Sequence, residues 1–226
     1  FNGLGSVIIS LIDSGKRFNR DWIFRHITHT FETGRSYAIT GPNGSGKSTL
    51  LQSIAGSIQL SEGREEYGIS TTEQGILNIE GKAEQYTNVP SENFYRYLSI
   101  AAPYIELIEE MTAKEFLHFH RQFKPLVSQV SIDEILSVIG LEKSADKQIR
   151  YFSSGMKQRI KLAQAIFSDV PVLLLDEPCT NLDTGGYQLY HKLMEGYCTN
   201  KLIIVSSNDE QEMDFCAEKL NIIDYK

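Results

Sequence analysis

Several features that mark other protein classes are scarce or missing in this sequence of 226 residues. Its 3 cysteines, Cys179, Cys198 and Cys216, lie far apart and form no Cys-x-x-Cys pair. This spacing argues against a disulfide framework and indicates a reducing compartment. No apolar run approaches the roughly 18 residues needed to span a bilayer, and no basic segment followed by an apolar run stands near Phe1. We therefore expect no membrane helix and no signal peptide, and contact with a membrane only through a partner.

An excess of positive charge is also missing. Lys and Arg total 22 and Asp and Glu total 29, which gives a net charge of −7. This balance argues against a protein that binds nucleic acid by releasing counterions. Hydrophobic residues make up 41% of the chain, with 11 Tyr and 11 Phe, so intrinsic disorder is excluded as the main state. The length suits one α/β unit with an added subdomain.

The distribution of apolar runs predicts the fold class. Strand-like runs occur at residues 7–12, 37–40, 95–100, 172–175, 202–205 and 220–225. Helix-length segments separate the later runs, which predicts a parallel sheet with crossover helices. The polar stretch Gly63–Pro90, with a short alternating run at Gly75–Glu80, predicts small antiparallel strands. From Thr112 to about Ile149 the pattern is helical, and Gly140 is expected to end one helix there.

A glycine-rich loop stands between a strand at Ser36–Thr40 and a helix that begins at Lys47 and runs to about Ala55. Its residues are Gly41, Pro42, Asn43, Gly44, Ser45, Gly46, Lys47, Ser48 and Thr49. This is the pattern G-x-x-x-x-G-K-[ST] in its required strand–loop–helix context. The glycines let backbone N–H groups wrap phosphates, Lys47 can reach the β- and γ-phosphates, and the Ser48 hydroxyl can hold Mg²⁺.

Two further segments complete the set of motifs. The apolar strand Val172–Leu175 is followed by Asp176 and Glu177, a pair suited to metal positioning and to general-base activation of water, respectively. Ser153 is a natural N-cap for a helix that carries a buried stripe, and alone it would indicate an ordinary capped helix. The stripe consists of Met156, Ile160, Ala163 and Phe167.

Taken together, these residues resemble the ATP-binding subunits of ABC transporters over essentially the whole chain. Residues 41–49 look like the Walker A loop, Leu173–Glu177 like Walker B with its catalytic glutamate, and Phe152–Met156 like a divergent signature motif. Thr180–Asp183 resembles the D-loop. Phe18 stands where the family places an aromatic residue that stacks on adenine.

The resemblance implies a fold and a mechanism. The expected fold is an ABC-type P-loop NTPase: a mainly parallel core sheet flanked by helices at residues 1–111 and 150–226, with an antiparallel β part and a helical subdomain at about 112–149. Two such domains would pair head to tail around ATP and Mg²⁺, with Ser153 and Gly155 contacting the γ-phosphate of the opposite site and Asp183 communicating with it. Ser48 and Asp176 would hold the metal, and Glu177 would act as base. The partners would be a membrane-spanning permease, which the helical subdomain would receive, and a second ATP-binding domain. The subunit would lie at the cytoplasmic face of the membrane.

Three departures from the family pattern bear on turnover. Phe152, Ser154 and Met156 replace Leu, Gly and Gln of the signature. Asn208 stands at the position of the switch histidine, and an amide can form hydrogen bonds but cannot carry a proton. Ala101 and Ala102 stand where a Q-loop glutamine is expected. These changes predict slow hydrolysis and leave open a nucleotide-dependent regulator with little turnover. A soluble ABC-type ATPase acting on ribosomes or DNA is a separate alternative.

Overall fold

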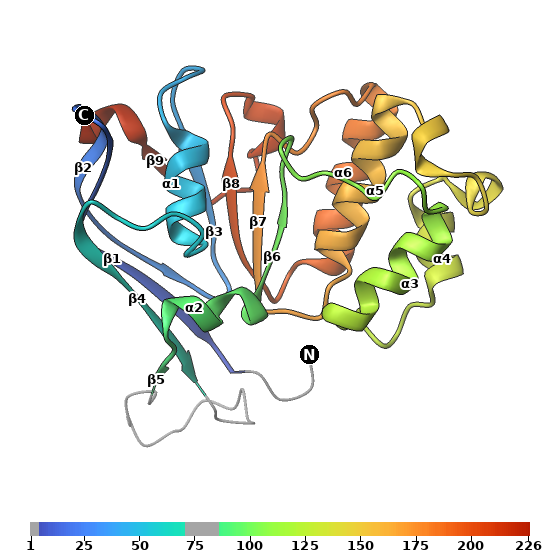
Figure 1. Cartoon of the computed structure of the whole chain (residues 1–226), viewed down its shortest axis with the longest axis horizontal. Helices are drawn as coiled ribbons and strands as arrows, with labels where there is room; N and C mark the ends of the chain where they lie inside the picture. Colours follow the sequence, from blue (N-terminus) through green and yellow to red (C-terminus); the bar gives the residue numbers. More distant parts are fainter. Residues whose placement is uncertain (1–4, 71–85) are drawn as a thin grey trace.

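The computed structural model describes residues 5–70 and 86–226, which form two β-sheets with helices between and beside them (Figure 1). One sheet is antiparallel with the strand order β2-β1-β4-β5, and the other is parallel with the order β6-β7-β8-β3-β9. The strands are β1 (Val7–Phe18), β2 (Asp21–Glu32), β3 (Ser36–Thr40), β4 (Glu62–Ser70), β5 (Tyr86–Asn88), β6 (Leu98–Ala101), β7 (Val172–Asp176), β8 (Leu202–Ser206) and β9 (Glu218–Asn221). The α-helices are α1 (Lys47–Ile54), α2 (Ser91–Phe94), α3 (Ala113–Phe123), α4 (Ile132–Val138), α5 (Ser154–Ile166) and α6 (Thr184–Tyr197). The predicted α/β class, with a parallel core sheet and separate antiparallel strands, is confirmed.

The parallel sheet is buried on both faces. Along β7, Leu173 and Leu175 point into one apolar cluster, whereas Val172 and Leu174 point into another. Because successive side chains of a strand alternate between faces, an uninterrupted apolar run is what a doubly covered strand requires. This is why β7 and β8 read as continuous runs in the sequence.

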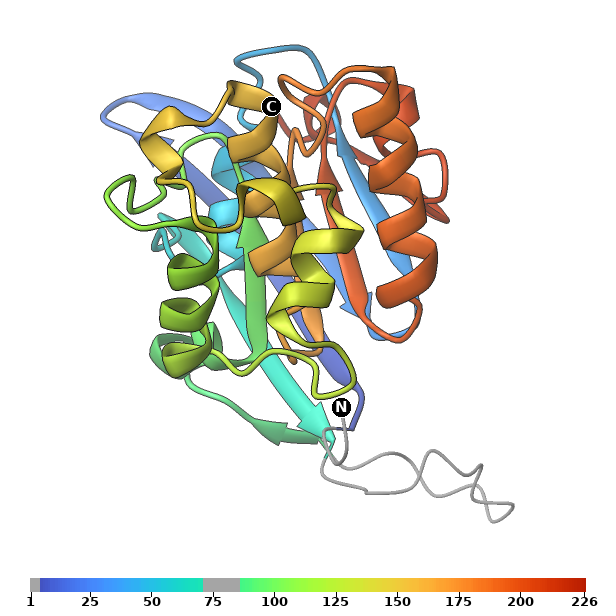
Figure 2. The ribbon, with the colours of Figure 1, turned by 90° about the vertical axis from the view of Figure 1, so that its right-hand side faces the viewer.

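Different helices cover the two faces of the parallel sheet. Helix α1 lies between the two sheets and contacts β1, β3, β7 and β8. Helices α5 and α6 pack together on the opposite face, and α3 and α4 lie outside α5 (Figure 2). The apolar residues Ile132, Ile135, Leu136 and Ile139 bury one face of α4, and Gly140, with φ 69°, follows the end of that helix as expected. Within the described part of the chain, no helix is both long and apolar enough to cross a bilayer.

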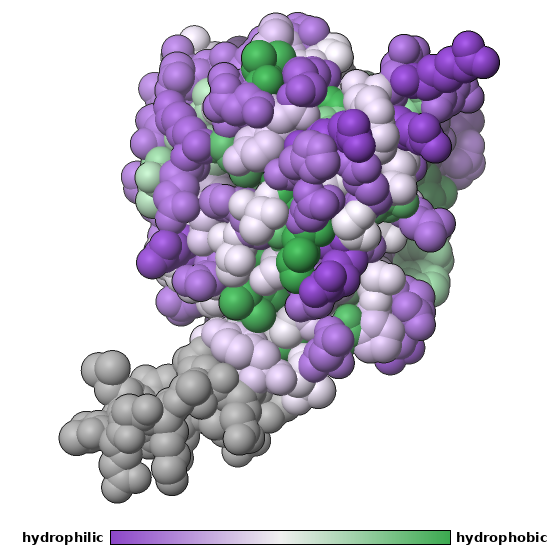
Figure 3. Space-filling view, turned by 90° about the vertical axis from the view of Figure 1, so that its left-hand side faces the viewer, coloured by the Kyte–Doolittle hydropathy of each residue, from purple (hydrophilic) through white to green (hydrophobic). Residues whose placement is uncertain are grey.

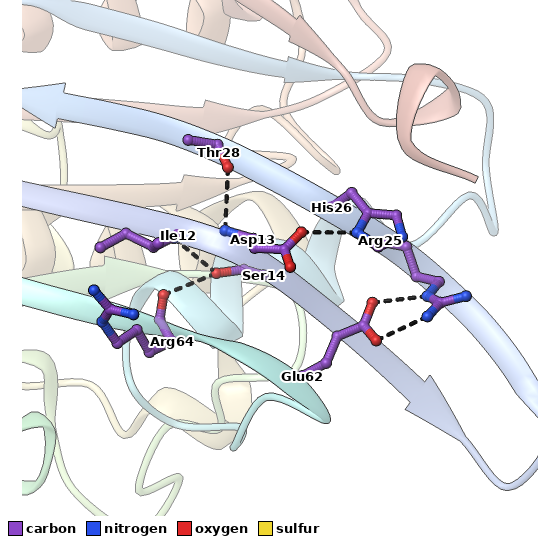
Figure 4. A network of polar contacts seen from close by, with 8 residues as sticks. All are labelled: Ile12, Asp13, Ser14, Arg25, His26, Thr28, Glu62 and Arg64. Carbon is purple, nitrogen blue, oxygen red and sulfur yellow. Dashed lines mark hydrogen bonds and ion pairs between the residues drawn. The ribbon is translucent and has the colours of Figure 1, made fainter.

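Strand β2 has no counterpart among the expected strands, because an irregularity breaks its alternation. Its buried residues Phe24 and Ile27 are three positions apart rather than two, and His26 between them has φ 56°. Asp13 on β1 is also left-handed, with φ 48°, and its carboxylate contacts His26 Nδ1 at 2.7 Å (Figure 4). A bulge of this kind shifts the side-chain pattern by one residue, so a period-two search does not find the strand.

Polar contacts near this bulge link the three strands β1, β2 and β4. Arg25 on β2 forms two hydrogen bonds with the carboxylate of Glu62 on β4, at 2.7 and 2.9 Å (Figure 4). Ser14 donates a hydrogen bond to the carbonyl of Arg64 at 2.9 Å. The outward face of the antiparallel sheet is accordingly mostly hydrophilic (Figure 3).

Three strand predictions are wrong in their bounds. The strand expected at residues 7–12 is β1, which continues to Phe18. The strand expected at residues 95–100 begins only at Leu98, because Tyr95–Tyr97 forms a 3-10 turn (η1) after α2. The strand expected at residues 220–225 is β9, which ends at Asn221, whose side chain accepts a hydrogen bond from Ile223 N at 3.2 Å and starts the 3-10 turn Ile222–Tyr225 (η5). The alternating run predicted at Gly75–Glu80 lies outside the described residues, whereas β4 and β5 on either side of it pair antiparallel as expected.

Gly63 is expected to be required by packing as well as by backbone conformation. Both Gly63 and Gly34 have positive φ, 70° and 83°, but a Cβ at Gly63 would lie 2.1 Å from the Asp13 carbonyl oxygen, whereas a Cβ at Gly34 has no neighbour within 4 Å. Gly34→Ala should therefore lower the free energy of unfolding by about 1 kcal/mol, the left-handed backbone cost alone. Gly63→Ala should lower it by about 1–3 kcal/mol more through the added clash. Urea denaturation of both variants measures the difference, and equal losses would contradict this packing argument.

Candidate functional site

The glycine-rich loop connects β3 to α1 in a conformation that depends on its glycines. Gly41, Gly44 and Gly46 have φ values of 145°, 76° and 102°. A Cβ at Gly46 would lie 2.2 Å from Ile23 Cγ2, so the loop also packs closely on the start of β2. Left-handed backbone turns N–H groups toward a common point, and the N-terminus of α1 adds partial positive charge there. The loop is thus built to bind an anion.

Two polar side chains inside this loop suit the same ligand. Lys47 is only 4% exposed, and its Nζ donates to the carbonyl oxygens of Gly41 at 2.9 Å and Pro42 at 3.3 Å. The buried Ser45 Oγ has no hydrogen-bond partner among the described residues. A buried ammonium held only by backbone carbonyls, beside an unpaired hydroxyl, is a donor set for phosphate oxygens.

Asp176 and Glu177 lie at the carboxyl end of β7. Asp176 is 2% exposed, and its Oδ1 accepts a hydrogen bond from Ser206 Oγ at 2.7 Å. Glu177 has φ 43°, and its N–H donates to the Ser206 carbonyl oxygen at 2.8 Å. Since β8 lies between β7 and β3, both acids come to the sheet edge from which the glycine-rich loop starts. A hydroxyl and a carboxylate, the groups that Ser48 and Asp176 carry, are among the hard oxygen ligands that Mg²⁺ prefers.

Asn208 connects the end of β8 to the glycine-rich loop. Its Nδ2 donates to Asn43 Oδ1 at 3.0 Å, although the two residues are 165 positions apart. Its neighbour Ser207 donates its N–H to the Ile39 carbonyl oxygen of β3 at 3.2 Å. The structure thus brings three predicted elements, the loop, the acid pair and Asn208, to one edge of the parallel sheet.

The segment after β6 places a tyrosine near this edge that sequence reasoning missed. Ala101 and Ala102 are fully buried and offer no polar group. Tyr104 follows them; burial and the charge of Asp176 raise its pKa to about 12, and a hydrogen bond with Gln52 acts in the other direction. Gln52 lies on α1 four positions after Ser48, on the same helix face. The sequence signal that could have found it is an aromatic residue just after β6, the strand that pairs with the Asp176-bearing strand β7.

The predicted signature residues lie on the opposite side of the parallel sheet. Ser153 caps α5 by accepting a hydrogen bond from Met156 N at 3.2 Å, and it is itself exposed. Asp183 caps α6 through Gly186 N at 2.8 Å, and a Cβ at Gly155 would lie 3.1 Å from the Asn181 carbonyl oxygen. The predicted signature and D-loop segments are therefore neighbours. The buried residues of α5 and those of α1 belong to separate apolar clusters on opposite faces of the parallel sheet.

Phe18 lies at the end of β1 and is 47% exposed. The ammonium of Lys16 stands 5.0 Å from its ring centroid, so a cation covers part of the ring. Phe18 pairs with Asp21, two residues before the Ile23 that packs on Gly46. An exposed aromatic ring on the hairpin that packs on the glycine-rich loop through Ile23 suits stacking on a planar group.

Residues 24–180 match the family model described as ABC transporter. The chain belongs to the ABC transporter family. An uncharacterised ABC transporter ATP-binding protein of Bacillus subtilis, YybJ, is 30% identical over 92% of this chain and 89% of its own length. A cytochrome c biogenesis ATP-binding export protein, CcmA of Agrobacterium fabrum, is 30% identical over 87% of this chain and 86% of its own.

Solved structures confirm the fold of this ABC family member. A putative ABC transporter ATP-binding protein from Pyrococcus furiosus superposes with a TM-score of 0.74 at 19% identity, covering 97% of this chain and 99% of that chain. A bacterial Atm1-family ABC exporter with ATP bound superposes with a TM-score of 0.75 at 18% identity, covering 97% of this chain and 38% of that chain. The chain thus matches ATP-binding proteins of the family in sequence and in fold.

Lys47→Ala should weaken nucleotide binding strongly, because Lys47 is the buried cation of the glycine-rich loop. Loss of a charge-assisted hydrogen bond to phosphate corresponds to an increase in the Kd of Mg-ATP of about 10- to 100-fold. Calorimetric titration of the variant measures it, with Lys192→Ala, an exposed lysine of α6, as control. Equal affinity of Lys47→Ala and wild type would contradict the assignment of the loop.

Proposed function

We propose that this chain binds Mg-ATP at the glycine-rich loop, hydrolyses it slowly, and drives an ABC transporter through ATP-dependent pairing of two such domains. The observation that carries the proposal is the meeting of loop, acid pair and Asn208 at one sheet edge, through the Asn43–Asn208 and Asp176–Ser206 hydrogen bonds. We further propose that the subunit lies at the cytoplasmic face of a membrane against a permease subunit. Support comes from relatives whose names describe export proteins.

The roles of the residues follow from their positions. Backbone N–H groups at the start of α1 and the Lys47 ammonium bind the phosphates. Ser48 and Asp176 are the residues that would hold Mg²⁺, which when bound neutralises phosphate charge. Glu177 accepts the proton of the attacking water, and its backbone bonds to Ser206 and Thr180 fix its position. Phe18 stacks on the adenine ring.

A second copy completes the site. Ser153 is exposed and stands at the N-terminus of α5, on the face of the parallel sheet away from α1. Ser153 and Gly155 therefore contact the γ-phosphate of a partner chain rather than that of their own. Asp183 lies beside them and reaches the same interface.

Slow turnover follows from the groups that surround the attacking water. Asn208 offers an amide hydrogen bond where an imidazole would offer a charge-assisted one, which is roughly twice as strong. Ala101 and Ala102 add no polar side chain.

Two other functions are compatible with these residues: a regulator with little turnover, supported by Asn208, and a soluble ABC-type ATPase. Copurification with a polytopic membrane protein distinguishes the transporter subunit from the soluble enzyme.

Glu177→Gln should trap a dimer in the presence of ATP. Removal of the base leaves the γ-phosphate intact, and the γ-phosphate then holds the Ser153–Met156 segment of the second chain. Sedimentation should show a mass near twice that of the monomer with ATP and the monomer mass without it. An unchanged mass at concentrations well above micromolar would argue against head-to-tail pairing.

Asn208→His should raise the rate of ATP hydrolysis. An imidazole adds a charge-assisted hydrogen bond that strengthens in the transition state, and a gain of about tenfold corresponds to roughly 1.4 kcal/mol of barrier. Steady-state phosphate release measures the rate, and ATP affinity serves as control. A slower variant with normal ATP affinity would mean that Asn208, bonded to Asn43, is adapted to this site.

A further inference from the structure

Glu212 is a buried acid close to the candidate site that the roles above do not use. It lies in the 3-10 turn Glu210–Glu212 (η4), four residues after Asn208, and is 3% exposed. No Lys, Arg or His forms an ion pair with it within residues 5–70 and 86–226. An unpaired carboxylate in the interior is costly unless hydrogen bonds satisfy it, so its contacts require an explanation.

Both carboxylate oxygens of Glu212 accept hydrogen bonds, and the two donors come from different loops. Oε1 accepts from the backbone N–H of Cys179 at 2.7 Å, two residues after Glu177. Oε2 accepts from Ser207 Oγ, directly before Asn208. One side chain thus joins the loop after β7 to the loop after β8.

The surroundings hold this carboxylate in place. Ser207 Oγ also accepts from Asp209 N at 2.9 Å, so its own hydrogen is directed to Glu212. From α6, Tyr190 donates its hydroxyl to the Glu212 backbone carbonyl oxygen at 2.9 Å, and Tyr187 donates to Asp209 Oδ2 at 2.8 Å. Two tyrosines of α6 therefore hold the segment after β8 that carries Glu212.

The electrostatics show how close Glu212 stands to the site. Burial raises the pKa of Glu212, the hydrogen bonds from Ser207 and Cys179 lower it, and the charges of Asp209 and Glu177 raise it. The charges facing it are acidic, so the two hydrogen bonds are what favours the ionised form.

We propose that Glu212 is a positioning residue for ATP hydrolysis: its carboxylate fixes the loop that carries Glu177 against the loop that carries Asn208. The inference rests on the proposed hydrolysis by this chain. Glu212 acts through Cys179 and Ser207 on Glu177 and Asn208, the two residues proposed to face the γ-phosphate. Loss of the link leaves phosphate binding by the glycine-rich loop intact and reduces only the chemical step.

Glu212→Ala removes both hydrogen bonds, and Glu212→Gln keeps the shape with one acceptor and no charge. The matched control is Glu210→Gln, on the same turn, where an exposed carboxylate pairs with Lys219 at 2.6 Å. In Glu212→Ala we expect kcat to fall about 10- to 100-fold, as for other residues that orient catalytic groups, with the KM and Kd of ATP unchanged. Glu212→Gln should fall between Glu212→Ala and wild type.

Two further measurements separate positioning from a general structural role. Amide hydrogen exchange should speed up at residues 177–182 and 207–209 in Glu212→Ala and remain unchanged in the core helices. Adding Ser207→Ala to the Glu212→Ala variant should not lower kcat further, because the Ser207 side chain acts through its hydrogen bond to Glu212. Should Glu212→Ala fail to fold, the same comparison is made between Ser207→Ala and Glu212→Gln.

The inference is overturned if kcat of the Glu212 variants stays within about twofold of the Glu210→Gln control. It is equally overturned if exchange rises throughout the chain and ATP affinity falls along with kcat. Absence of hydrolysis in the wild type would contradict the proposed function instead, and the exchange measurement, which needs no turnover, would still test the link between the two loops.

Discussion

The parallel pairing of β8 between β3 and β7 is the constraint on which the candidate site depends. It brings the glycine-rich loop, the acid pair and Asn208 to one sheet edge, although they come from distant parts of the chain. Each of the three strands is an apolar run buried on both faces, so the hydrophobic effect that forms the sheet also sets the relative positions of the polar residues that follow it. The core and the site are products of one packing arrangement.

How far the sequence predicts this site depends on how local each signal is. The loop at residues 41–49 is local, since its glycines, Lys47 and the following helix are contiguous, and the structure has the predicted strand and the start of the predicted helix there. Asp176 and Glu177 end a short apolar run that predicts a buried strand, and the structure has that strand as β7. The Asn43–Asn208 bond and the Glu212 links join residues far apart in sequence or on different loops, and no periodicity encodes them.

Irregular backbone accounts for the rest of what was missed. Strand β2 was not predicted because the left-handed His26 breaks its alternation. The predicted start of β6 is three residues too early because Tyr95–Tyr97 forms a turn first. Tyr104 was missed because its nearness to Asp176 depends on the path of an irregular segment after β6. Register shifts and turns of this kind are decided by tertiary packing rather than by residue type.

The left-handed backbone of Glu177 lowers the stability of the fold at the residue that is proposed to act as general base. A non-glycine residue at φ 43° carries a conformational cost of roughly 1–2 kcal/mol, which Gly or Asn would lower. The N–H bond to Ser206 and the carbonyl bond from Thr180 hold the strained geometry in place. The chain therefore keeps a carboxylate where the backbone alone would favour a different residue, and the free energy of folding of the rest of the chain offsets this local cost.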